Sequence, residues 1–290
     1  MAEIVTEPSS GTNGKSTYQM DEHADSEAAL RRVETAGNLS ISPELFEKLY
    51  LSPKNEVSNN LRTTFGNPSP LAVVGFILSL TPLSCALLGW RGSGGLGAAE
   101  NGAYYFFGGL LMFTGGLLEF VLGNTFPFVV FCSYGAYWFT FGATLTPYYN
   151  AYGAYSPDDP AAGLTDPVFL STFAFFLLWM GVLSFIYLIA SLRTNILFFL
   201  IFLTLCPMYC CLAAGDWQAA QGNAEAALTL QHAGGAMAFM SCLIGWYDFL
   251  VLVLLAVDFP LNLPVGDLSH IIKGAGQTGG RRLRVKISRV

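Results

Sequence analysis

The sequence predicts an all-α integral membrane protein with six transmembrane helices, because it is apolar throughout and its apolar residues come in long blocks. Of its 290 residues, 53% are hydrophobic and 12% are charged, whereas a typical soluble domain is about 25% charged. The blocks are about as long as the roughly 20 residues that a helix needs to cross a bilayer. Runs such as Phe173–Leu178 lack the alternation of a β-barrel strand, so we expect helices.

The first span is preceded by a helix-start signal. Asn67 is a favourable N-cap residue, and Pro68 and Pro70 suit a first turn, whose N–H groups have no partner within the helix. Such a start presents its positive dipole end near the membrane boundary, where it can meet an anion. The six expected spans are Leu71–Gly89, Tyr104–Leu122, Phe126–Leu145, Leu170–Ala190, Ile196–Ala214 and Ala233–Val257.

The second span carries a glycine stripe. Gly108–Leu111 and Gly115–Leu118 have the same Gly-Gly-Leu-Leu sequence, repeated after seven residues. Seven residues are about two helical turns, so the glycines share one face. In lipid, such stripes let helix backbones approach closely. We interpret the stripe as a packing face of a tightly bundled or oligomeric protein.

Glu119 is the acid that lies deepest in a predicted span. It follows Gly116 by three residues, so it points to the glycine side of the helix rather than to lipid. One interpretation is a neutral carboxyl group that hydrogen-bonds between helices, to Asn124 or Thr125; the other is a proton-coupling residue. Asp248 in the last span is a second candidate.

The third span places Tyr134 and Trp138 one turn apart on one face. Aromatic residues in membrane helices usually serve packing. The alternative is a ring that narrows a pore and leaves one hydrogen-bond donor for a passing carboxyl group.

The charge distribution predicts that both termini are cytosolic, because Lys and Arg in short loops mark the cytoplasmic side. Arg193 follows the fourth span, whereas the loop after the fifth is expected to hold only the acids Asp216 and Glu225. Arg91 is the exception. We divide the chain into a largely disordered cytosolic tail (1–62), a transport domain (63–265) and a basic cytosolic tail (266–290).

Three motifs resemble the acetate uptake transporter family, also called YaaH-type, in order and spacing. Asn67–Leu71 is similar to the family's N-P-A-P-L-G-L signature, Gly123–Phe126 continues to Ser133–Gly135, and Leu263–Gly266 follows the last span. Ser69 departs from the signature, as do Ala72 and Val73, which bears on the exact substrate. The long N-terminal tail looks fungal, since compact bacterial members lack it.

The resemblance implies a bundle like that of the proton-gated urea channel, assembled as a ring of subunits, often six. It also implies a narrow point formed by a phenylalanine, a tyrosine and a leucine, which correspond to Phe76, Tyr134 and Leu205. Substrate-binding candidates are therefore Asn67, Pro68, Pro70, Leu71, Phe76, Tyr134 and Leu205, with Glu119 as the proton-coupling candidate.

These features predict proton-coupled or channel-like transport of acetate, with succinate or other short acids as further substrates, in the plasma membrane. The alternatives are ammonium or ammonia transport and a non-transporting regulator of the acetic acid response. The sequence lacks the motifs of soluble enzymes, so we predict no enzyme, no cofactor and no metal site. The C-terminal bases suit the lipid bilayer better than nucleic acid.

Overall fold

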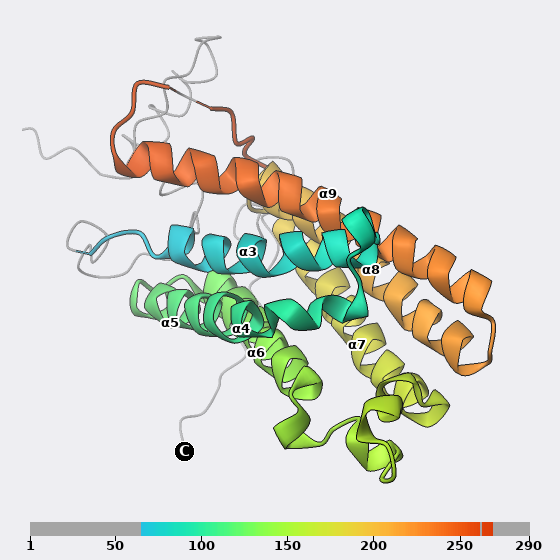
Figure 1. Cartoon of the computed structure of the whole chain (residues 1–290). Coiled ribbons are helices and arrows are strands. Elements are labelled where there is room, and N and C mark those ends of the chain that lie inside the picture. Colours follow the sequence, from blue (N-terminus) through green and yellow to red (C-terminus); the bar gives the residue numbers. More distant parts are fainter. Residues whose placement is uncertain (1–64, 262, 269–290) are drawn as a thin grey trace, which may run out of the picture. The chain divides into compact units, whose positions relative to one another are not determined.

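The computed structural model describes residues 65–261 and 263–268, and these residues are helical apart from connecting turns (Figure 1). Six helical segments are long and apolar enough to cross a membrane, which confirms the predicted number of spans. Their elements are α3 (Ser69–Leu87), α4 (Asn101–Ala103) with η4 (Tyr104–Leu111) and α5 (Met112–Val121), α6 (Thr125–Leu145), α7 (Pro167–Ser191), α8 (Ile196–Ala220) and α9 (Ala224–Ala256). Most of both predicted tails lies outside the described residues.

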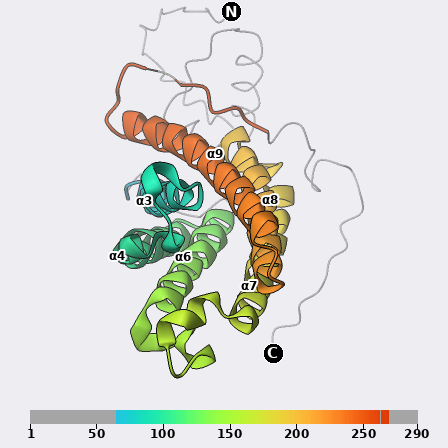
Figure 2. The same cartoon turned by 45° about the vertical axis from the view of Figure 1, so that its right-hand side comes forward.

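The helices pack in a continuous series. α7 packs along α8, α8 along α9, and α9 along α3, while α3 also contacts η4 and α5, which pack on α6. Figures 1 and 2 show α3 lying between α9 and the α4–α5 segment. The connections include short 3-10 turns, among them η3 (Gly95–Glu100) and η7 (Pro160–Thr165).

The glycine stripe is a packing face inside the bundle. A Cβ atom on Gly115 would lie 2.8 Å from Cβ of Ala72 on α3, and one on Gly116 would lie 2.7 Å from Sγ of Cys132 on α6. Both distances are too short for real side chains. The second span therefore passes close to two neighbouring helices at once, as the absence of side chains at these positions allows.

Two helices extend further than the apolar blocks. α8 continues to Ala220, and α9 begins at Ala224. The expectation that Asp216 and Glu225 lie in a loop is therefore wrong. Alanine and glutamine are good helix formers, so α8 continues to Ala220, and the chain then turns at Gly222, where the backbone takes a positive φ of 80°.

The third motif fastens the segment after α9 to the start of α8. Ile196 N–H donates to the Gly266 carbonyl oxygen at 2.9 Å, and Leu268 N–H donates to the Thr194 carbonyl oxygen at 3.0 Å. The Tyr247 hydroxyl of α9 donates to the Pro264 carbonyl oxygen at 2.8 Å. The motif thus provides backbone partners for the connection that leads into α8.

Candidate functional site

The first motif forms the start of α3 as expected. The helix begins at Ser69, and Asn67 Oδ1 accepts a hydrogen bond from Ser69 N–H at 3.0 Å. Asn67 thus satisfies one N–H group of the first turn, although the N-cap position itself is taken by Pro68. Pro68 is buried, and Pro70 and Leu71 are partly exposed.

Glu119 links the first two motifs. Its side chain is fully buried. Ser69 Oγ donates to Glu119 Oε1 at 2.5 Å, and Asn124 Nδ2 donates to Oε2 at 2.6 Å. Because Ser69 begins α3 and Asn124 precedes α6, one carboxyl group connects the starts of two helices. Asn124 is one of the two partners suggested from the sequence; Ser69 was not foreseen.

Phe76, Tyr134 and Leu205 meet at one small cavity, which we call the constriction cavity. It has a volume of about 30 Å³ and is also lined by Asp248. On this measure a water molecule needs about 10–15 Å³, so there is room for about two. The remaining lining residues are apolar: Val73, Met112, Val130, Phe131, Phe198, Ile201 and Phe202.

The Tyr134 hydroxyl is already paired within the bundle. It lies 2.7 Å from Ser184 Oγ, and that hydroxyl donates to the Met180 carbonyl oxygen. The two hydroxyl groups therefore satisfy one another inside the bundle, as buried polar groups normally do. That Tyr134 donates to a passing carboxyl group stays a prediction.

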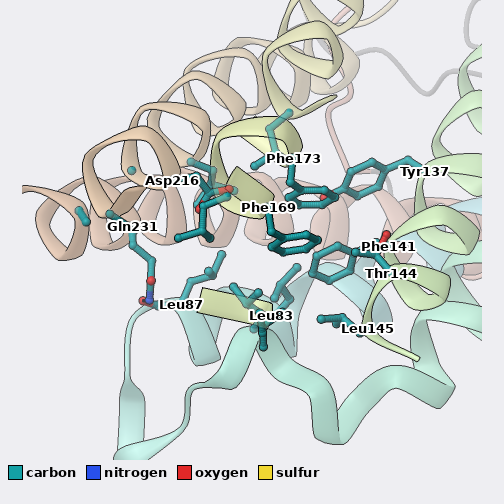
Figure 3. Close-up of a pocket in the computed structure, with 18 residues that line it drawn as sticks. Leu83, Leu87, Tyr137, Phe141, Thr144, Leu145, Phe169, Phe173, Asp216 and Gln231 are labelled. Carbon is teal, nitrogen blue, oxygen red and sulfur yellow. Dashed lines mark hydrogen bonds between the residues drawn. The ribbon is translucent and has the colours of Figure 1, made fainter. Parts of the chain in front are cut away.

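A second and larger cavity lies farther along the same helices, and we call it the Asp216 cavity. Its volume is about 90 Å³. Figure 3 shows Asp216 and Gln231 on one side and the rings of Phe141, Phe173 and Tyr137 on the other. The other lining residues are Leu83, Leu87, Leu96, Thr144, Leu145, Leu164, Phe169, Leu170, Leu177, Leu212, Gly215, Ala219 and Ala227.

The two cavities are lined by the same helices, at positions two helical turns apart. Each constriction residue has a counterpart seven positions later on its own helix that lines the Asp216 cavity. The three pairs are Phe76 and Leu83, Tyr134 and Phe141, and Leu205 and Leu212. Seven residues of helix rise about 10.5 Å. The cavities therefore follow one another along the interior shared by α3, α6 and α8.

Sequence reasoning missed Asp216, because the fifth apolar block ends before it. The signal that could have found it is the run of helix formers that continues to Ala220, followed by Gly222 and Asn223 as a stop signal. The described residues hold no group of three or more His, Cys, Asp or Glu side chains arranged to bind a metal ion.

The six membrane-length helices and the cavities between them place the protein in the class of multi-pass membrane proteins that have a site inside a helix bundle. The family follows from comparison with known proteins. The model of the GPR1/FUN34/yaaH family matches residues 50–270, and the chain belongs to that family, which confirms the resemblance seen in the motifs.

Named relatives and a solved structure agree with this membership. Protein alcS of Aspergillus fumigatus is 44% identical over 245 residues, covering 84% of this chain and 89% of the relative. The acetate transporter protein patA of Penicillium expansum is 32% identical over 207 residues, covering 71% and 79%. The structure of the bacterial acetate channel SatP matches with a TM-score of 0.57 at 24% identity, covering 70% of this chain and 99% of that one. That last likeness concerns the fold.

Proposed function

We propose that this protein transports small monocarboxylates, acetate foremost, across the plasma membrane. The observation that carries the proposal is that Phe76, Tyr134 and Leu205, from three helices, line one narrow cavity, and that residues seven positions later on the same helices line a larger one. An interior series of small cavities suits the passage of small molecules and does not by itself choose among them. Relatives that are named as acetate transporters make acetate the first candidate.

In the proposed mechanism, the pathway includes the constriction and the start of α3, where Asn67, Pro68, Pro70 and Leu71 bind the substrate. Glu119 is the proposed proton-coupling residue, because it is a buried carboxyl group between the starts of α3 and α6. A proton that moves with the anion cancels the cost of carrying charge against the membrane potential, about 2.3 kcal/mol per 100 mV. Succinate or other short acids are further candidates.

The proposal includes the arrangement in the membrane. Both termini are cytosolic, which puts Arg193 and the start of α3 on the cytosolic side and Asp158 on the opposite side. The subunit forms a urea-channel-like bundle, and six copies assemble into a ring in which each keeps its own pathway. The partly exposed apolar residues of the second span, such as Phe106 and Phe120, are available to lipid or to another subunit.

Uptake of labelled acetate by the purified protein in lipid vesicles tests the proposal. We expect uptake above that of protein-free vesicles, and its loss in Leu205→Trp, which plugs the constriction cavity. Leu203→Trp is the matched control, because Leu203 lies on the same helix and is 44% exposed. Equal uptake in both tryptophan variants would contradict a pathway through this cavity.

Ammonium or ammonia movement is the second candidate, because the constriction cavity is lined by no basic residue. A pathway without fixed positive charge also suits a neutral molecule or a small cation. Labelled methylammonium in the same vesicles distinguishes the two substrates. A regulator that does not transport would move neither of them.

A further inference from the structure

Asp216 is the charged residue among those that line the larger cavity. Tyr137 on α6 is the other titratable group in that lining set, and the lining residues from α3, α7, α9, η3 and η7 carry no charge. No basic side chain therefore balances Asp216 across the cavity. An ionised Asp216 makes the cavity unfavourable for a second anion, because like charges repel strongly where water is scarce.

The other polar groups of the cavity offer few hydrogen-bond donors. Thr144 Oγ1 donates its hydrogen to the Thr140 carbonyl oxygen at 2.9 Å. Gln231 Nε2 donates to the Leu87 carbonyl oxygen at 3.1 Å, which uses one of its two N–H groups. A carboxylate can only accept hydrogen bonds, so an anion would have to share with Asp216 the donors that remain, the second N–H group of Gln231 and the hydroxyl group of Tyr137. An undissociated carboxylic acid carries an O–H group that can donate to Asp216.

The aromatic wall favours an apolar group over a cation. Tyr137 and Phe141 stack with ring centroids 6.0 Å apart and planes 7° apart, and Phe169 and Phe173 stack at 5.9 Å and 8°. Phe141 also stacks on Phe173, at 6.4 Å. Because these ring faces are turned to one another, they form a hydrocarbon wall rather than the open aromatic faces that bind an ammonium group.

The size of the cavity fits a short acid. Its volume of about 90 Å³ is room for several water molecules, or for one molecule with a few non-hydrogen atoms and a small shell of water. The methyl group of acetic acid can contact the aromatic wall while its O–H group reaches Asp216. Longer chains would have to displace the apolar side chains that close the cavity.

We infer that the Asp216 cavity is a binding site for undissociated short-chain monocarboxylic acids and that Asp216 excludes their anions. The inference rests on the proposed function for its substrate class, and it adds the form of the substrate that this site accepts. Asp216 hydrogen-bonds the acid proton, and the aromatic wall holds the alkyl group. The site lies two helical turns from the constriction, so it selects the substrate before or after that passage.

Binding to the protein in lipid nanodiscs tests the site independently of transport. The probe is the methyl signal of acetate in saturation-transfer NMR, at pH 5 and pH 7.5. Small carboxylic acids titrate at roughly pH 4–5, so acetate at pH 7.5 is nearly all anion. We expect binding at pH 5 and its loss at pH 7.5, whereas acetamide, a neutral donor of the same shape, binds at both.

Asp216→Asn removes the charge and adds an N–H donor, so binding at pH 7.5 should rise about tenfold. Asp158→Asn is the matched control, because Asp158 is exposed and lies outside the cavity, and its profile should equal that of the wild type. Ala219→Phe fills the cavity with a side chain and should abolish binding at pH 5. This variant separates the Asp216 cavity from any acetate bound elsewhere.

The outcomes separate the two proposals. If the wild type binds acetate equally at both pH values, or if Asp216→Asn leaves the profile unchanged, the inference is wrong. If methylammonium displaces acetic acid from the wild type but not from Asp216→Asn, the cavity is a cation site and the inference is also wrong. If the expected binding is found and vesicles take up no acetate, the proposed function fails and the binding site stands.

Discussion

Two acids lie in the two halves of the helix bundle, and their surroundings are opposite. Glu119 is fully buried, and each of its carboxyl oxygens accepts a hydrogen bond, from Ser69 and from Asn124. Asp216 lines a cavity in which Thr144 donates its hydrogen to the Thr140 carbonyl oxygen and Gln231 uses one of its two N–H groups on the Leu87 carbonyl oxygen. A carboxyl group that is supplied with donors therefore joins helices, whereas one that faces a cavity with few donors can select a ligand.

The largest effect is expected for Glu119→Ala. This change leaves Ser69 Oγ and Asn124 Nδ2 without their shared acceptor and opens a cavity beside the glycine stripe. Truncating a buried side chain of this size costs roughly 2–5 kcal/mol, so abundance in the membrane should fall strongly. Asp216→Ala, which removes no side-chain hydrogen bond among the described residues, serves as the comparison and should keep near-normal abundance. Equal losses in both would remove the contrast between the two acids.

Glu119→Gln should preserve the fold and change transport. The glutamine carbonyl can accept from Asn124, while its N–H₂ group donates to Ser69 Oγ, because a hydroxyl can be either donor or acceptor. We expect normal abundance, with a lower maximal rate of acetate uptake and a flatter dependence of that rate on pH. Asp216→Asn should instead lower the apparent KM for acetate at pH 7.5. If the Glu119→Gln vesicles keep the wild-type pH profile, Glu119 is structural and the proton travels on the substrate.

Phe76→Ala tests the segment between the two acids. Removing the ring widens the constriction cavity, so larger acids such as lactate or succinate should enter, at a cost of roughly 3–5 kcal/mol in stability. Competition of these acids against labelled acetate measures the change, with membrane abundance determined in parallel. Leu78→Ala is the control, because Leu78 lies on the same helix and does not line the cavity. An unchanged size preference in a well-expressed Phe76→Ala protein would put the narrow point elsewhere.

The smallest change in stability is expected for Asn67→Ala. Loss of the hydrogen bond from Ser69 N–H to Asn67 Oδ1 costs about 1 kcal/mol. Abundance should stay normal, whereas uptake should fall strongly, because Asn67 lies at the cytosolic end of the proposed pathway and accepts from Ser69, the residue that donates to Glu119. Asn67→Ser keeps a side-chain acceptor and should restore part of the uptake. Uptake at the wild-type rate in Asn67→Ala would make Asn67 purely structural.

The apolar blocks predicted the number and order of the spans, because each helix that crosses a bilayer needs a long run of apolar residues, and such runs can be read from the sequence. They did not predict that α8 reaches Ala220 or that α9 begins at Ala224, since a helix can continue past the hydrocarbon on residues that are not apolar. The π-helical winding of η4 (Tyr104–Leu111) had no signal in the sequence. It depends on how the second span packs against its neighbours.

The candidate site was predicted only in part, because contacts between residues far apart in the sequence depend on helix packing. The family resemblance pointed to Phe76, Tyr134 and Leu205, which line one cavity, and nearness in the sequence pointed to Asn124 as a partner of Glu119, which it contacts. The contact between Ser69 and Glu119 joins residues 50 positions apart, and no local pattern indicates it. The same holds for Tyr134 and Ser184, whose hydroxyl groups lie 2.7 Å apart although the two residues are 50 positions apart in the sequence.

The fastening of residues 264–268 to the start of α8 has a consequence for biosynthesis. Ile196 N–H and the Thr194 carbonyl oxygen receive their partners from Gly266 and Leu268, which leave the ribosome some 70 residues later in the chain. Until then, the turn between α7 and α8 lacks those partners, and a chain stopped after α9 keeps it incomplete. The last described segment therefore completes the fold when its hydrogen bonds to the start of α8 form, and a chain truncated after α9 lacks these bonds.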